Sequence, residues 1–113
     1  MKYAVLLYDD PAQWENVDEG RMATLHAEYM AITKEPESYG GAQLQPGETA
    51  KTLRMADGNL LVSDGPFTET KEVLSGFYLV DAETEERALE LAAKIPTVSQ
   101  MGGVIEVRPI VER

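Results

Sequence analysis

The sequence contains no cysteine, which excludes disulfide bonds, thiolate metal sites and a cysteine nucleophile. Its single histidine, His26, makes a zinc site unexpected, since such sites use several nitrogen or sulfur ligands. No loop has the ligand spacing of a calcium site, and no glycine-rich phosphate-binding motif is present. We therefore expect no metal and no other cofactor.

Basic residues are also few, with 10 Lys and Arg against 20 Asp and Glu, giving a formal net charge of −10. Because the basic residues are scattered, we expect neither nucleic acid nor an anionic membrane surface as a partner. No stretch approaches the roughly 20 apolar residues of a membrane-spanning helix. The short apolar run at residues 3–8 is not a signal peptide, so the expected location is the cytoplasm.

The remaining composition is that of an ordinary globular protein. The chain has 113 residues, of which 43% are hydrophobic and 27% are charged. No low-complexity stretch or internal repeat divides it. We expect one domain covering residues 1–113.

Hydrophobic periodicity predicts six strands and two helices. The strands are expected at residues 2–8, 39–45, 51–56, 60–63, 74–81 and 104–111, and the helices at 18–35 and 84–95. Asp57 and Gly58 predict a hairpin turn, Gly76 a bulge or a close backbone approach, and Pro36 and Pro96 the helix ends. The order predicts an α+β, ferredoxin-like β-α-β-β-α-β fold with an extra hairpin.

The strand at residues 2–8 is apolar on both faces, and the strand at 74–81 is largely so. Two helices can cover only one face of the sheet. A monomer would expose the other face, and large exposed apolar patches mark interfaces. We therefore predict a homodimer with its two sheets packed face to face.

Asp64, Gly65, Pro66 and Phe67 follow the predicted hairpin. Pro66 fixes its own φ and is expected to hold Gly65 extended, giving a rigid turn. On these residues alone, a plain turn is the more common interpretation. The alternative is a wall of a small-molecule site that presents one carboxylate and one aromatic ring.

Residues 64–72 closely resemble the signature of the DGPF family, part of the wider YCII-related group. The resemblance extends along essentially the whole chain, through residues 1–3, 40–41, 44–46, 76–80 and 107–110. Thr68 stands where alanine is usual in the signature. The resemblance implies a dimeric α/β barrel with a cleft near the signature turn.

The resemblance does not fix a reaction. Some relatives are similar to dehydrochlorinases of chlorinated aromatics that use a His–Asp pair. Others occur beside extracytoplasmic-function sigma factors, which implies an accessory role.

His26 is the candidate general base. It lies roughly 40° from Met22 around the predicted helix, on the expected inward half. An unperturbed imidazole pKa of about 6.5 suits a base. The structural alternative is a histidine at the edge of the core. The YCII-related group carries a catalytic histidine on this helix, which implies the same role for His26, with Asp64 or Asp9 as partner.

Five further residues are candidates for binding a substrate. Phe67 and the strand tyrosines Tyr39 and Tyr78 could shape an apolar cleft, although strand tyrosines more often only pack. Glu69 and Lys71 belong to the signature, although such a charged run is commonly a solvated surface.

Our leading hypothesis is a small-molecule enzyme or binder. As an enzyme it would use cofactor-free acid–base chemistry, an elimination or hydrolysis of a small aromatic compound, with His26 as base and Asp64 orienting it. The alternative is a non-catalytic accessory protein that binds a metabolite or a regulatory partner. Whether the chain is an enzyme, and whether two subunits share the cleft, stays open.

Overall fold

The computed structural model describes residues 1–68 and 70–113. The strands are β1 (Lys2–Asp9), β2 (Ser38–Gln43), β3 (Lys51–Ala56), β4 (Asn59–Asp64), β5 (Val73–Asp81) and β6 (Val104–Pro109). The helices are α1 (Glu19–Thr33), α2 (Glu85–Ala93) and α3 (Pro96–Ser99), with short 3-10 turns η1 (Pro11–Trp14) and η2 (Gly47–Thr49).

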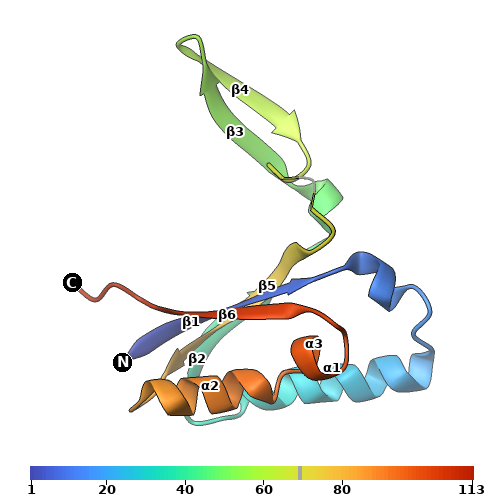
Figure 1. Cartoon of the computed structure of the whole chain (residues 1–113), viewed down its shortest axis with the longest axis vertical. Coiled ribbons are helices and arrows are strands. Elements are labelled where there is room, and N and C mark those ends of the chain that lie inside the picture. Colours follow the sequence, from blue (N-terminus) through green and yellow to red (C-terminus); the bar gives the residue numbers. More distant parts are fainter. Residues whose placement is uncertain (69) are drawn as a thin grey trace.

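Four strands form one antiparallel sheet in the order β2-β5-β1-β6. Helices α1, α2 and α3 lie on one face of this sheet, and within the described residues the other face carries no helix (Figure 1). The chain is therefore an α+β protein, as predicted, and its topology is consistent with a ferredoxin-like fold.

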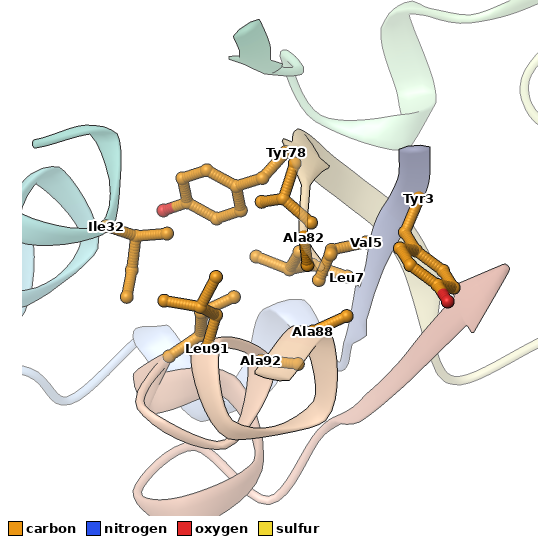
Figure 2. Close-up of a cluster of buried hydrophobic side chains, with 11 residues drawn as sticks. Tyr3, Val5, Leu7, Ile32, Tyr78, Ala82, Ala88, Leu91 and Ala92 are labelled. Carbon is orange, nitrogen blue, oxygen red and sulfur yellow. The ribbon is translucent and has the colours of Figure 1, made fainter. Parts of the chain in front are cut away.

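The core lies between the sheet and the helices. Tyr3, Val5 and Leu7 alternate along β1 onto the helix side, where Leu91 and Ala92 of α2 meet them (Figure 2). Burying each large apolar side chain stabilises the fold by roughly 1.5–3 kcal/mol. This layer fixes which face of every central strand points toward the helices.

Both long helices begin at a capping side chain. The Asp18 carboxylate accepts from the backbone N–H of Arg21 at 2.8 Å, and the Thr84 hydroxyl from that of Arg87 at 3.1 Å. The second helix ends before Pro96, as expected, but at Ala93 and not at residue 95. Pro96 opens the short helix α3, because proline suits a first turn that needs no N–H donor.

Gly76 marks both a bulge and a close backbone approach, as predicted. Leu7 pairs with Gly76 but Tyr8 pairs with Leu74, so β5 carries one extra residue there. A side chain at Gly76 would meet the Ala42 carbonyl oxygen at 2.9 Å. The bulge moves Leu74 to the face opposite that of Gly76, Tyr78 and Val80.

Strands β3 and β4 form a separate two-stranded sheet that projects away from the body on the side without helices (Figure 1). We call residues 51–64 the arm. Its turn has positive φ at Asp57 (51°) and Gly58 (80°), as the Asp-Gly pair predicts. Every arm residue except the half-buried Thr52 is exposed. The molecule is thus a flat L, 47 × 44 × 18 Å.

Candidate functional site

A cleft of about 610 Å³ lies where the arm joins the body. The segments before and after the arm form most of its walls, and the ends of β1 and β5 complete it. Its lining residues include Tyr8, Leu44, Pro46, Lys51, Thr52, Pro66, Phe67, Thr68, Thr70, Glu72, Val73 and Leu74. The predicted signature turn therefore supplies one wall of the cleft.

Gly65 shapes this turn, but not in the way expected from Pro66. Its φ is +89°, a left-handed value that glycine adopts without strain, so the extended conformation predicted for it is wrong. The Gly65 N–H donates to the Ala50 carbonyl at 2.8 Å, and its carbonyl accepts from the Thr52 hydroxyl at 2.7 Å. These two bonds tie the turn to the opposite wall of the cleft.

Phe67 follows the turn with 76% of its surface exposed, and its ring lines the cleft. Charged groups of both signs, Lys51 and Glu72, also line it. An aromatic ring beside one ammonium and one carboxylate group suits a small ligand that is partly apolar and partly charged.

Asp64 does not line the cleft. It stands opposite Lys51 across the arm, and its carboxylate forms an ion pair with the Lys51 ammonium group at the surface. Within one chain, the contact of Asp64 is thus a cross-strand ion pair.

Tyr8 is the wall contributed by the body. The pKa of its hydroxyl is raised, first by a hydrogen bond to the Glu106 carboxylate and then by burial. The phenol therefore stays protonated and donates its one O–H to Glu106 at the edge of the cleft. From the sequence alone, Tyr8 is as ambiguous as Tyr39 and Tyr78, since a strand tyrosine either lines a pocket or only packs.

Asp9, the next residue, is buried on the opposite face of β1, with 5% of its surface exposed. Trp14 donates its indole N–H to the Asp9 carboxylate at 3.1 Å. Burial raises the pKa of Asp9, although the hydrogen bond from Trp14 opposes this. Asp9 thereby anchors the η1 turn, and the partner Trp14 was not predicted from the sequence.

His26 was expected on the inward half of its helix, and this placement is wrong because the residue is exposed. Leu25 and Ile32, which are buried, set the inward direction of α1, and His26 lies about 100° from Leu25 around the helix. Met22, from which the expectation was measured, is itself exposed.

The structure of one chain does not bring His26 and Asp64 together. His26 lines a shallow depression on α1 with Val17, Glu19, Met22 and Ala23. Helix α1 lies beneath the sheet, whereas Asp64 is in the arm on the other side (Figure 1). Catalytic roles for the two residues stay predictions.

The two tyrosines expected at the site lie elsewhere. Tyr78 is buried in the core, and its hydroxyl donates to the Tyr29 carbonyl at 2.8 Å. Burial raises the pKa of Tyr78 to about 12. Tyr39 lies at a bulge in the edge strand β2, with the Lys2 ammonium group 5.5 Å from its ring centroid. Neither residue lines the cleft.

The charged signature residues contribute less than expected to the described cleft. The Lys71 ammonium group lies 4.0 Å from the Asp10 carboxylate at the surface, outside the cleft lining. Glu69 lies outside the described residues. Within residues 1–68 and 70–113, no cluster of acidic and histidine side chains could hold a metal ion. In the same part of the chain, no helix is long and apolar enough to cross a membrane.

Comparison with known proteins agrees with the resemblance seen in the sequence. A family model described as the YCII-related domain matches residues 1–113. An uncharacterized protein of Rhizobium meliloti (strain 1021), R00369, is 38% identical over 114 residues, which cover 97% of this chain and 92% of that protein. With the whole length matched, this chain belongs to the YCII-related family.

Proposed function

We propose that this chain is a small-molecule-binding protein whose ligand occupies the cleft at the base of the arm. The observation that carries this proposal is the position of Phe67, an exposed aromatic ring held against a cleft that also contains Lys51 and Glu72. Large exposed aromatic rings are costly in water, and ligand pockets are typically lined by such rings with a few polar groups. The favoured ligand is a small aromatic acid.

A binding measurement tests this proposal directly. Benzoate, 4-hydroxybenzoate and 4-chlorobenzoate are titrated into labelled protein, and chemical shifts are followed by nuclear magnetic resonance. We expect shifts at residues that line the cleft, and roughly tenfold weaker binding for Phe67→Ala, since an aromatic contact of this kind contributes about 1.4 kcal/mol.

Val111→Ala is the matched control. Val111 is an equally exposed apolar residue, at 74%, in the C-terminal segment that lies at the opposite end of the sheet (Figure 1). Equal affinities for both variants, or no shifts at the cleft with any of the three compounds, would rule out the proposed site.

We propose cofactor-free acid–base chemistry, elimination or hydrolysis, as the reaction if the ligand is turned over. Glu72 is a carboxylate that can accept a proton at the cleft, and the Tyr8 hydroxyl, kept protonated beside Glu106, supplies one when its O–H turns from Glu106 to the ligand. Turnover that survives in both Tyr8→Phe and Glu72→Gln would contradict this assignment.

A non-catalytic accessory role is the second candidate, and the arm favours it. The arm projects from the body with apolar side chains in solvent, as a surface that binds another polypeptide would. Binding of the aromatic acids without conversion, together with a co-purifying protein that shields the arm, would favour this role over catalysis.

We also propose a cytoplasmic homodimer packed through the uncovered sheet face. Support comes from β1, where Ala4, Leu6 and Tyr8 point away from the helices and remain partly exposed in one chain. A second sheet packed on this face would cover them. Sedimentation equilibrium at micromolar concentrations is expected to give twice the 12.5 kDa chain mass. Leu6→Glu, which places a charge on this face, is expected to give the mass of one chain.

A further inference from the structure

The arm has one strongly apolar face. Leu53 pairs with Val62 and Met55 with Leu60, so all four side chains lie on the same face of the two strands. Their exposed fractions are 60%, 54%, 65% and 61% in the order Leu53, Val62, Met55, Leu60. A lone two-stranded hairpin is marginally stable at best in water. This face therefore needs a covering surface.

The uncovered face of the four-stranded sheet is the second apolar surface. Ala4 and Leu6 of β1 pair with Leu79 and Phe77 of β5, and all four point away from the helices. The arm rises on this same side of the sheet (Figure 1). A partner molecule seated on the uncovered sheet face would therefore lie alongside the arm.

The charge distribution indicates which partner molecule this is. The arm carries Lys51 and Arg54 against Asp57 and Asp64, a net charge of zero, in a chain whose net charge is −10. Two copies of so acidic a chain repel each other at most surfaces. A neutral arm is a surface on which a second copy can approach without that repulsion.

The uncovered sheet face has the same property. On β1, β5 and β6 its charged residues are Lys2 and Arg108 with Asp81 and Glu106, a net charge of zero. The excess negative charge therefore lies on the helices and loops. A positively charged partner would bind to the helices and loops, and not to the arm or the uncovered sheet face.

The dimensions also fit a second copy. Two sheets packed face to face lie about 10 Å apart, and a six-residue strand is about 20 Å long. The arm therefore extends past the plane that the sheet of a second copy would occupy.

We propose that the arm is a clasp: its apolar face, formed by Leu53, Met55, Leu60 and Val62, packs against a second copy of this chain seated on the uncovered sheet face. This inference rests on the proposed homodimer and adds the role of the arm. Tyr8 lies both on the uncovered face and in the cleft wall. The second copy thus closes the open side of the cleft, and the site is complete only in the dimer.

Neighbouring residues on opposite faces of β4 provide a matched test. Val62→Glu places a charge on the apolar face, and Leu61→Glu places the same charge on the face that carries Arg54. We expect Val62→Glu to weaken dimerisation at least about tenfold, since burial of one valine is lost and a charge is desolvated. Leu61→Glu should change dimerisation less than about threefold.

Cross-linking shows where the arm lies. Because the chain has no cysteine, Met55→Cys and Arg54→Cys each introduce a single site for a photoreactive benzophenone. Irradiation should join two chains efficiently from position 55 and much less from position 54. Peptide mapping should place the cross-links on the body of the second copy. Circular dichroism of every variant confirms that the body stays folded.

The outcomes separate the clasp from the dimer itself. If Leu79→Glu abolishes dimerisation but Val62→Glu leaves it unchanged, the clasp is wrong and the sheet-face dimer stands. If position 55 cross-links only within its own chain, the clasp is wrong as well. A wild-type protein that stays monomeric at all concentrations overturns both.

Discussion

Asp9 shows how one position in a strand decides the environment of a carboxyl group. Tyr3, Val5, Leu7 and Asp9 alternate onto the helix side of β1, so the carboxyl group follows three apolar side chains into the core. Asp10, one residue on, caps the η1 turn instead, accepting from the Ala12 N–H at 3.0 Å. Two adjacent aspartates thus differ because one continues the strand and the other leaves it.

The buried carboxyl group predicts a specific dependence of stability on pH. Because burial raises the folded-state pKa of Asp9, the folded state binds its proton more tightly than the unfolded state does. The contribution of Asp9 to the free energy of unfolding is fully present below the unfolded pKa of about 3.9. It is lost as the pH rises through the higher folded-state pKa. As the pH rises over this range, we expect Asp9→Asn to become more stable relative to the wild type, by about 1.4 kcal/mol in the free energy of unfolding for each unit of pKa difference.

Urea denaturation of both proteins between pH 3 and pH 8 measures this difference. Parallel stability curves for the variant and the wild type would show that Asp9 titrates alike in the folded and unfolded chains.

At the scale of elements, Arg87 joins α2 to the segment that follows α1. Its guanidinium group lies 2.6 Å from the Glu37 carboxylate and 3.3 Å from those of Glu35 and Glu90. The pKa of Glu37 is lowered, first by its hydrogen bond to Arg87. This interaction stabilises the protein above the unfolded pKa of glutamate and is lost as pH falls through the lower folded value.

We expect Arg87→Ala to lower the melting temperature, because three carboxylates then remain near one another without their common cation. Arg87→Lys should restore only part of the loss, since an ammonium group cannot reproduce the fork of the guanidinium. Thermal melts at low and high salt measure both effects, and the loss should shrink in high salt. Full restoration by lysine would show that charge alone matters.

The signature turn makes a separate prediction. Gly65→Ala would introduce a Cβ that meets no atom within 4 Å, so only the backbone conformation at φ +89° is penalised, by about 1–2 kcal/mol. We expect the amide at position 65, which donates to Ala50, to exchange roughly 5–30 times faster in the variant. Hydrogen exchange by nuclear magnetic resonance measures this. The Ala82 amide, in the body of the protein, serves as the internal control.

The sequence predicts the elements well because strong local patterns produce them. The short apolar run at residues 3–8 predicts β1, apolar residues at helical spacing predict both long helices, and Asp57 with Gly58 predicts the turn of the arm. The orientation of Tyr78 was harder to predict, because β5 is apolar on both faces and no local rule selects the face toward the helices. The predicted position of His26 was wrong for a related reason. Only Leu25 and Ile32 of the apolar residues on α1 are buried, and these two, not the whole apolar stripe, set which side of the helix faces the core.

The site was predicted only where it is local in sequence. Pro66, Phe67 and Thr68 line the cleft, and the resemblance of this segment to the family signature implies a cleft there. Tyr8 and Lys51 reach the same cleft from distant parts of the chain. Their arrival depends on how the arm joins the sheet, which no spacing in the sequence reveals.

At the scale of the whole molecule, net charge sets how the proposed dimer responds to salt. Each chain has a net charge of −10, and its excess negative charge lies on the helices and loops, so two chains repel each other. The proposed interface between them is nearly neutral. The Debye length falls from about 30 Å at 0.01 M salt to about 10 Å at 0.1 M. We therefore expect dimerisation to strengthen several-fold over this range, as measured by sedimentation equilibrium. Weakening with added salt would point to an interface held by ion pairs.

The order of strands in the sheet has a consequence for synthesis on the ribosome. Strand β1 is made first, yet both of its partners, β5 and β6, come from the second half of the chain, and Tyr3 pairs with Pro109. At about 5–20 residues per second, the apolar β1 segment waits for several seconds or more before its neighbours emerge. Until then the nascent chain exposes a strand that is apolar on both faces, and this interval is when chaperones would be most needed.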